Sequence, residues 1–321
     1  MARSAISVTA VLAFVLHTLP VTAARGADAP DTLVAAGPKR TVLAAGDTTR
    51  APIDLSMGQP VIEVFLNGRG PYRMFLDTGA GTTVLDQSLA RELGLAKRGE
   101  TRLGDPADPR AILADVVTID TLRIGTALFI GVPAASWDRS ALRPGVDRPR
   151  GVVGLPVFRE LLETIDFPAA MLRLWRGHLG EPGGAILHYR SMGGVPLIPI
   201  DVAGAAMEAH LDTGSPSFLS IPEKDSSLVH FAGPLREVGR GRTVNSVVMF
   251  RGAPLDGAVR VGGASFDRPL VVLNDRLPVP ILGSRALRDC VVTLDAANQR
   301  VRIESTRQSA PDTPKAPPAQ H

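Results

Sequence analysis

The chain contains the same short stretch twice, as MFLDTGA at residues 74–80 and as AHLDTGS at residues 209–215. In both copies a mostly apolar run ends directly in an Asp-Thr-Gly triplet. A single triplet could be an ordinary turn, because short motifs arise by chance in a glycine-rich chain. Two triplets at the ends of two apolar runs are much harder to obtain by accident. They indicate an internal repeat.

The similarity extends to both sides of the triplets. Upstream, VIEVFL (61–66) and LIPIDV (197–202) are each followed by a glycine-containing turn and a returning apolar run, which predicts a β-hairpin in each copy. Downstream, GVVGL (151–155) corresponds to PILGS (280–284), and both are followed by segments with strand-like alternation. The pattern therefore predicts two halves with the same order of strands.

The composition agrees with a mainly β protein. Hydrophobic residues make up 45% of the chain and aromatic residues only 4%, and there are 32 Gly and 27 Pro, which favour short strands joined by tight turns. The clearest helical pattern is residues 87–93, with Asp86 as the N-cap and Gly94 at the end. A second short helix is expected at residues 157–162.

Several classes of function are disfavoured. The net charge of +3 comes with no basic run, so nucleic acid is a poor candidate partner. The six histidines show no metal-binding spacing, and neither a nucleotide-binding loop nor a serine-nucleophile motif occurs, so we expect no cofactor and no metal. The single cysteine, Cys290, excludes an intramolecular disulfide and is expected to be a buried thiol. His210 is expected to be solvated.

The chain divides into six parts by composition. Residues 1–24 resemble an export signal, with a positive start, an apolar stretch and small residues at the end; a membrane anchor is the alternative, but the apolar stretch is short for one. Exported, the protein would be periplasmic or extracellular. We expect a leader or loose arm at 25–51, a first lobe at 52–176, a linker at 177–194, a second lobe at 195–305 and a disordered tail at 306–321.

The two triplets suggest a chemistry. If the halves pack about a pseudo-two-fold axis, Asp77 and Asp212 meet, and two adjacent carboxylates share one proton. One can then act as a base towards water and the other as an acid towards a peptide group. Gly79 and Gly214 would let the backbone approach the carboxylates without a Cβ atom in the way. The hydroxyls of the adjacent threonines would lock the two loops together.

On these residues the chain resembles the aspartic peptidases, and retroviral-type and bacterial retropepsin-like members more than pepsins. The resemblance rests on each triplet and the two apolar residues and glycine that follow later, at 152–154 and 281–283. It implies a mainly β fold of two pseudo-symmetric β-barrel lobes with a substrate cleft between them. It also implies a monomer that cleaves peptides or proteins, with flap hairpins within residues 100–117, where 103–106 would be the tip, and 238–251. The implied site consists of the catalytic Asp77 and Asp212 with Thr78, Gly79, Ala80, Thr213, Gly214 and Ser215 in support.

Two further points remain open at the level of the sequence. Ser215 could donate its hydroxyl to Asp212 while Ala80 could not do so for Asp77, which predicts that Asp77 holds the shared proton more often. A peptide-binding or regulatory module that keeps the fold but cleaves little is the alternative function. A third possibility is a precursor whose residues 25–50 cover the cleft.

Overall fold

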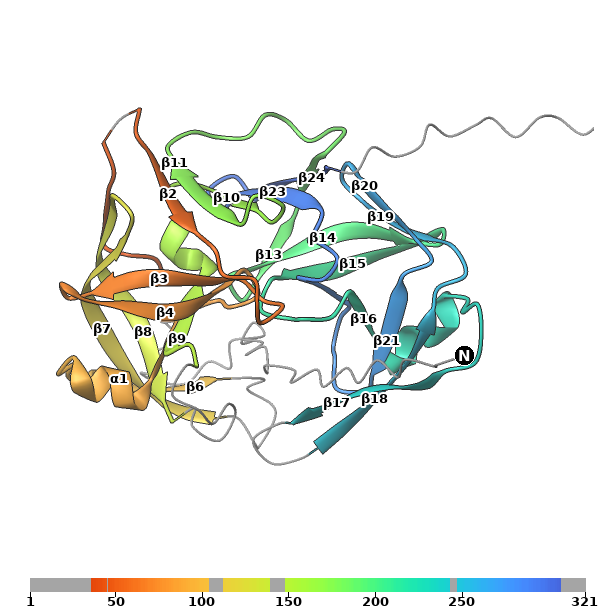
Figure 1. The fold of residues 1–321 in the computed structure, drawn as a ribbon, viewed down its shortest axis with the longest axis horizontal. Coiled ribbons are helices and arrows are strands. Elements are labelled where there is room, and N and C mark those ends of the chain that lie inside the picture. The colour runs from red at the N-terminus through yellow and green to blue at the C-terminus, as the bar shows by residue number, and fades with distance from the viewer. Residues whose placement is uncertain (1–35, 45, 104–111, 139–147, 243–246, 307–321) are drawn as a thin grey trace, which may run out of the picture.

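The structure is a computed structural model that describes residues 36–44, 46–103, 112–138, 148–242 and 247–306. The expected export signal, the first part of the leader, most of the predicted first flap tip and nearly all of the tail lie outside the described residues. Two lobes with a sheet between them make up the described part of the chain (Figure 1). Among the described residues, no helix is long and apolar enough to cross a membrane.

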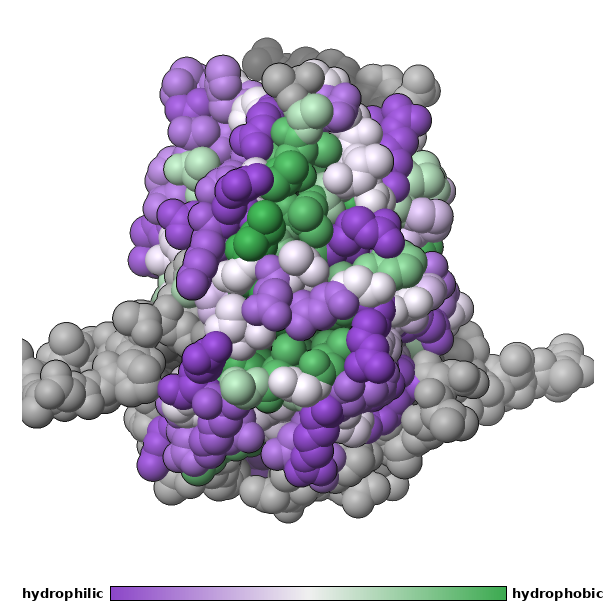
Figure 2. All heavy atoms as spheres, turned by 90° about the vertical axis from the view of Figure 1, so that its left-hand side faces the viewer, coloured by the Kyte–Doolittle hydropathy of each residue, from purple (hydrophilic) through white to green (hydrophobic). Residues whose placement is uncertain are grey.

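The first lobe is a closed β-barrel. Its strands follow the order β8-β5-β9-β4-β3-β7, and β7 pairs again with β8 to close the ring. The strands are β3 (Val61–Leu66), β4 (Arg69–Asp77), β5 (Thr83–Asp86), β7 (Ile112–Ile124), β8 (Ala127–Trp137) and β9 (Gly151–Gly154). The predicted hairpin at 61–76 is confirmed, and its turn residues Asn67 and Gly68 both have positive φ angles. Figure 2 looks onto this lobe, where hydrophobic residues form a strip flanked by hydrophilic ones.

The second lobe repeats this order in a sheet that curls without closing. The equivalent of the β3–β4 hairpin is β14 (Val195–Val202) with β15 (Ala205–Asp212). The long β7–β8 hairpin of the first lobe is replaced by two shorter pairs, β18 (Val247–Pro254) with β21 (Leu270–Asn274) and β19 (Ala258–Val261) with β20 (Ala264–Asp267). This sheet also contains β16 (Leu219–Pro222) and β22 (Ile281–Gly283).

A six-stranded sheet with strands from both halves joins the lobes, in the order β12-β24-β23-β10-β11-β2. Its central strands are β10 (Leu162–Asp166) and β23 (Cys290–Asp295), which pair antiparallel with Thr164 opposite Thr293. The two threonine hydroxyls are 2.8 Å apart, so the pseudo-two-fold axis passes between them. The outer strands are β11 (Met171–Trp175), β24 (Arg300–Ser305), β2 (Thr48–Pro52) and β12 (Ile186–His188).

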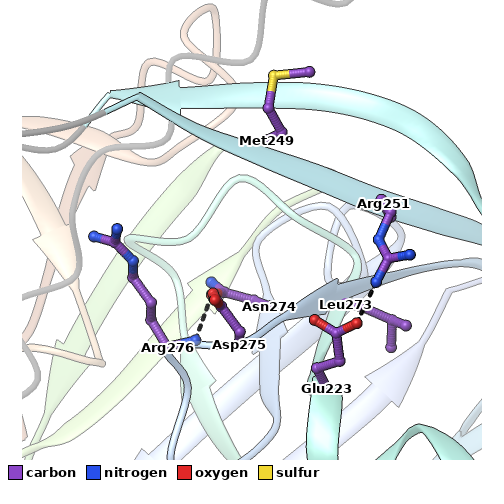
Figure 3. Close-up of a pocket in the computed structure, with 7 residues that line it drawn as sticks. All are labelled: Glu223, Met249, Arg251, Leu273, Asn274, Asp275 and Arg276. Carbon is purple, nitrogen blue, oxygen red and sulfur yellow. Dashed lines mark hydrogen bonds and ion pairs between the residues drawn. The ribbon is translucent and has the colours of Figure 1, made fainter.

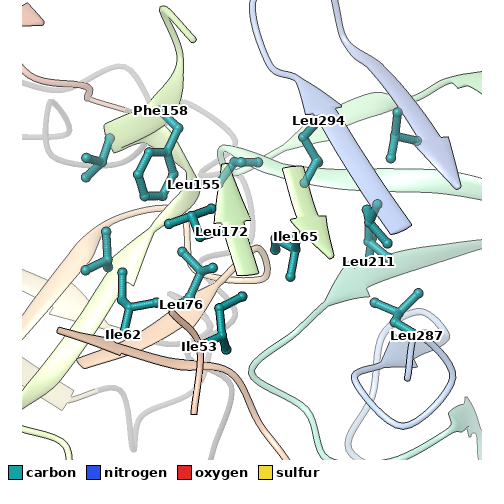
Figure 4. Close-up of a cluster of buried hydrophobic side chains, with 14 of the residues drawn as sticks. Ile53, Ile62, Leu76, Leu155, Phe158, Ile165, Leu172, Leu211, Leu287 and Leu294 are labelled. Atoms are coloured by element: carbon teal, nitrogen blue, oxygen red, sulfur yellow. The ribbon is translucent and has the colours of Figure 1, made fainter. Parts of the chain in front are cut away.

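The hydrophobic core runs without interruption through this sheet. Leu76 from the first lobe, Ile165 from the joining sheet and Leu211 from the second lobe belong to one buried cluster (Figure 4). Burying apolar area of this kind contributes about 25 cal/mol per Å². The two lobes are therefore fixed to each other by packing, and not only by the chain that connects them.

The helices agree with the sequence in the first lobe. Helix α1 (Gln87–Glu92) begins where predicted, and the Asp86 side chain accepts a hydrogen bond of 3.0 Å from the Ser88 amide as its N-cap. The second expected helix is a 3₁₀ turn, η1 (Leu155–Phe158), slightly earlier than predicted. In the second lobe, η2 (Glu223–Leu228) occupies the position of α1, although no helical pattern is visible there.

The segments predicted as an arm and as a linker contain strands. Within the predicted arm, β1 (Arg40–Val42) pairs with β8, and β2 pairs with β11 at the edge of the joining sheet. Within the predicted linker, β12 pairs with β24, and β13 (Arg190–Met192) pairs with β14. Both segments have weak patterns of their own, and their order comes from hydrogen bonds to strands distant in sequence. The described part of the arm is thus integrated into the fold and does not serve as a separate cover.

Candidate active site

The two aspartates occupy equivalent positions in the two lobes. Asp77 ends β4, which runs parallel to β9 with Asp77 opposite Gly154. Asp212 ends β15, which runs parallel to β22 with Asp212 opposite Gly283. The register of the two pairs is the same, which confirms the correspondence predicted between residues 151–155 and 280–284.

The glycines opposite the aspartates are required by a backbone crossing. A Cβ atom on Gly154 would lie 2.7 Å from the Ala80 carbonyl oxygen, and one on Gly283 would lie 2.7 Å from the Ser215 carbonyl oxygen. These distances are too short for any side chain. The apolar-apolar-glycine pattern therefore marks where the loop after each triplet passes directly over a strand.

Thr78 and Thr213 connect the two loops by reciprocal hydrogen bonds. The Thr78 hydroxyl donates to the Leu211 carbonyl at 2.7 Å and accepts from the Thr213 amide at 3.1 Å. The Thr213 hydroxyl donates to the Leu76 carbonyl at 2.7 Å and accepts from the Thr78 amide at 3.0 Å. Both side chains are buried, so each hydroxyl replaces water for two backbone groups of the other lobe.

Gly79 and Gly214 bring each loop against the carboxyl group of the other lobe. A Cβ atom on Gly79 would lie 2.5 Å from Cγ of Asp212, and one on Gly214 would lie 2.5 Å from Cγ of Asp77. The two carboxyl groups thus lie at the pseudo-two-fold axis, each in contact with the opposite triplet. The structure brings together all eight residues predicted for the site.

The two carboxyl groups differ in exposure. The Asp77 side chain keeps 8% of its surface exposed, and its Oδ1 accepts a 2.8 Å hydrogen bond from the Gly79 amide. Asp212 is fully buried, and its Oδ1 accepts a 3.1 Å bond from the Ser215 amide. Asp212 Oδ2 is buried and accepts no hydrogen bond from the described part of the chain.

This difference in burial affects the ionisation of Asp212. Burial, and next the negative charge of Asp77, raise the pKa of Asp212 well above its usual value, and the amides of Gly214 and Ser215 offset this only in part. These effects favour the protonated form of Asp212. This direction is opposite to the expectation from the sequence that Asp77 holds the shared proton more often, which considered the neighbouring hydroxyl and not the depth of burial.

The role expected for the Ser215 hydroxyl is wrong. This hydroxyl lies 2.8 Å from the hydroxyl of Ser217, which in turn accepts a 3.1 Å hydrogen bond from Ser220. Ser215 contacts the Asp212 carboxyl group through its backbone amide alone. Such an amide contact does not depend on the side chain, and the sequence therefore gives no sign of it.

His210 was expected to be solvated, but it is only 1% exposed. It is equivalent to Phe75 of the first lobe, and both precede their aspartate by two positions on a buried strand. The period-two pattern of a strand places them on the same face as the aspartates.

Two polar residues of the site were missed at the level of the sequence. Gln59 is buried and donates from Nε2 to the Gly214 carbonyl oxygen of the other lobe. The Ser284 hydroxyl lies 2.7 Å from the Gly58 carbonyl oxygen and 2.9 Å from that of Ser215. An alignment of the two repeats could have revealed them, because the first has Gln59 where the second has Val195, and the second has Ser284 where the first has Leu155.

The flap hairpins expected from the resemblance coincide with two hairpins of the structure. In the first lobe, β6 (Gly99–Leu103) pairs with β7, and in the second, β17 (Arg236–Arg242) pairs with β18. Each hairpin carries an exposed large apolar residue, Leu113 at 61% and Met249 at 46%. Most of the predicted first tip and residues 243–246 of the second lie outside the described residues.

A pocket of about 240 Å³ lies beside β18 and β21 of the second lobe (Figure 3). Its lining is mostly polar, with an ion pair between Arg251 and Glu223 and a 3.0 Å hydrogen bond from the Arg276 amide to Asn274. Neither aspartate of the dyad lines it. Across the described residues, no three His, Cys, Asp or Glu side chains are grouped in a way that could hold a metal ion.

Comparison with known proteins identifies one family. Residues 62–157 match the model of the family described as Aspartyl protease. The matched segment contains the first triplet, the strands of the first barrel and the Val-Val-Gly stretch that crosses the loop. No curated protein matches the chain.

Proposed function

Because residues 62–157 match the aspartyl protease family model, we propose that the chain is an aspartic endopeptidase in which Asp77 and Asp212 activate water together. The observation that carries the proposal is the reciprocal contact of the two triplets. Gly79 packs on the Asp212 carboxyl group and Gly214 packs on that of Asp77. The domain match covers only the first lobe, and this contact supplies the argument for a second aspartate.

The protonation states assign a role to each carboxyl group. Asp77 is the more exposed of the two and acts as the base, which takes a proton from water as its oxygen attacks the peptide carbonyl carbon. Asp212 is protonated and donates its proton to the carbonyl oxygen, which gives a neutral tetrahedral diol. Asp77 then passes its proton to the amide nitrogen, the C–N bond breaks, and a diol hydroxyl returns a proton to Asp212. The dyad thus regains its starting state.

The rigid backbone around the dyad supports this chemistry. The carboxyl oxygens accept hydrogen bonds from backbone amides that are held by the reciprocal threonine bonds. Donors fixed in advance need no reorganisation during the reaction, which is a major source of catalytic rate. The substrate would lie between the lobes as an extended peptide, with the apolar side chains of Leu113 and Met249 on the two flap hairpins near it.

The proposal includes export and a monomeric state. Residues 1–24 have the pattern of an export signal, which would place the enzyme in the periplasm or outside the cell. Both aspartates are on one chain, so catalysis does not need a second copy. Peptides or proteins are the expected substrates, with no cofactor.

The test is cleavage of a broad peptide library between pH 3 and pH 8 by the chain from residue 25 onwards. Asp77→Asn and Asp212→Asn should each reduce cleavage by about 10²–10⁴-fold, the usual contribution of general acid-base catalysis. Circular dichroism should show that both variants are folded. Cleavage that survives either substitution would place the activity elsewhere, and a folded wild type that cleaves nothing would favour a peptide-binding module.

A further inference from the structure

Gln59 reaches from the first lobe into the catalytic loop of the second. It lies just before β3, is 1% exposed, and donates from Nε2 to the carbonyl oxygen of Gly214. Next to it, the Gly58 carbonyl oxygen accepts a hydrogen bond from the Ser284 hydroxyl. The segment is therefore attached to the second lobe at two points.

The peptide group that Gln59 contacts is the one that serves Asp212. The carbonyl of Gly214 and the amide of Ser215 belong to the same planar peptide unit. The Gln59 side chain donates a hydrogen bond to the oxygen of this peptide unit, and the N–H of the same unit donates to Asp212 Oδ1 at 3.1 Å. A donor on the carbonyl fixes the orientation of the plane and polarises the N–H, because hydrogen bonds in a chain strengthen one another.

The first lobe has no equivalent of this contact. Strand register aligns Val61 with Leu197, so Gln59 corresponds to Val195, which is buried and has no side-chain donor. Likewise Ser284 corresponds to Leu155. The loop of Asp77 is thus bordered by apolar side chains at the two positions where the loop of Asp212 meets polar ones.

We propose that Gln59 is a positioning residue for Asp212, which holds the Gly214–Ser215 peptide so that its N–H stays directed at the carboxyl oxygen. The contact limits how strongly burial favours the protonated form of Asp212, since a hydrogen bond to a carboxylate stabilises the ionised state. The effect of the Gln59 contact on catalysis rests on the proposed peptidase function. The effect of the same contact on the ionisation of Asp212 is independent of that function.

A substitution at Gln59 leaves the other charged or titratable groups near this carboxyl group chemically unchanged. Asp77 faces it from β4, and His210 lies two positions earlier on β15. Arg288 approaches Gly58, with Nη2 3.7 Å from where a Cβ atom would be. A shift seen in a Gln59 variant therefore reports the lost donor.

The experiment compares Gln59→Met, which has a similar length but no donor, with the wild-type chain. The carboxyl carbon of Asp212 is followed by ¹³C NMR during a pH titration, a measurement that needs no activity. We expect the Asp212 transition to move up by about 0.5–1 pH unit. The basic limb of the kcat/KM profile should move in the same direction, with a fall in kcat of about 3–10-fold.

Val195→Ala is the matched control, since it disturbs the equivalent position in the other repeat without removing a hydrogen bond. It should lower stability and leave the Asp212 transition unchanged. If Gln59→Met does not fold, Ser284→Ala loosens the same segment and should give a smaller shift in the same direction. A folded variant that titrates like the wild type would overturn the inference, whereas a shift without any peptide cleavage would overturn only the proposed function.

Discussion

The two lobes share a backbone around the dyad but differ in the side chains that surround it. In both, an aspartate ends a strand, faces a glycine on a parallel strand and is followed by a loop that the opposite threonine holds. Yet Asp77 keeps 8% of its surface exposed and its loop is bordered by apolar residues, whereas Asp212 is fully buried and its loop is contacted by the polar side chains of Gln59 and Ser284. The symmetry belongs to the backbone, and the asymmetry belongs to the side chains.

This difference explains how a symmetric site can carry out an asymmetric reaction. Two identical carboxyl groups would share a proton equally, and neither would have a defined role. In the proposed mechanism, the greater burial of Asp212 favours its protonated form and leaves the base role to Asp77. The experiments below either remove an asymmetry between the lobes or test a feature that they share.

The largest expected effect concerns Glu163, whose equivalent across the axis is Val292. Glu163 is 1% exposed on β10, between Leu174 and Leu294, and neither carboxyl oxygen has a hydrogen-bond partner in the described residues. Burial raises its pKa from the usual 4.5 to about 8. Folding therefore favours the protonated form of Glu163. The free energy of unfolding is highest below about pH 4.5 as far as Glu163 is concerned, and it falls as the pH rises to about 8, because the unfolded chain ionises first.

Glu163→Val, which restores symmetry with Val292, and Glu163→Gln should remove this dependence. A shift of this size corresponds to about 5 kcal/mol between pH 4.5 and pH 8. Urea unfolding at several pH values would measure it, with Glu160→Gln as an exposed control that keeps the slope of the wild type. If both Glu163 variants keep that slope as well, Glu163 does not titrate as stated.

The next effect concerns the shared glycines. Gly79→Ala and Gly214→Ala each place a methyl group within about 2.5 Å of the opposite carboxyl group, so the carboxyl groups must separate. We expect a fall in kcat of about 10²-fold, the usual result of a misplacement of about 1 Å. The two losses should be similar, because the packing is symmetric. Steady-state kinetics on a peptide substrate would check this, and a loss in only one variant would show that the backbone symmetry is incomplete.

The threonines should give a smaller and also symmetric effect on stability. Thr78→Val leaves the Leu211 carbonyl and the Thr213 amide without their buried partner, and Thr213→Val does the same to the equivalent groups of the first lobe. Each should lower the free energy of unfolding by about 1–3 kcal/mol. Chemical denaturation of both single variants and the double variant would show the coupling, and strictly additive losses would contradict a reciprocal lock.

Most of the backbone of this site was predictable, because the repeat recorded it twice. The hairpins, the strand ends and the glycines each appear in both copies of the repeat. A pattern that occurs in both copies at the same position is hard to attribute to coincidence. The joining sheet was not predictable from local pattern, since β2 and β12 are short and depend on partners far along the chain. Burial depth was not predictable either, as shown by His210.

The smallest expected effect tests the correction for Ser215. Ser215→Ala gives the second triplet the same following residue as the first, and Ala80→Ser is the reverse change. Because the Ser215 hydroxyl bonds to Ser217 and only its amide reaches Asp212, the pH dependence of kcat/KM should stay where it is in Ser215→Ala. Loss of the hydroxyl pair should lower stability by about 1 kcal/mol. A basic limb that moved in Ser215→Ala would mean that the hydroxyl turns to Asp212 during catalysis. The asymmetry of the dyad would then arise from the residue after the triplet, and not from Gln59 and the buried surroundings.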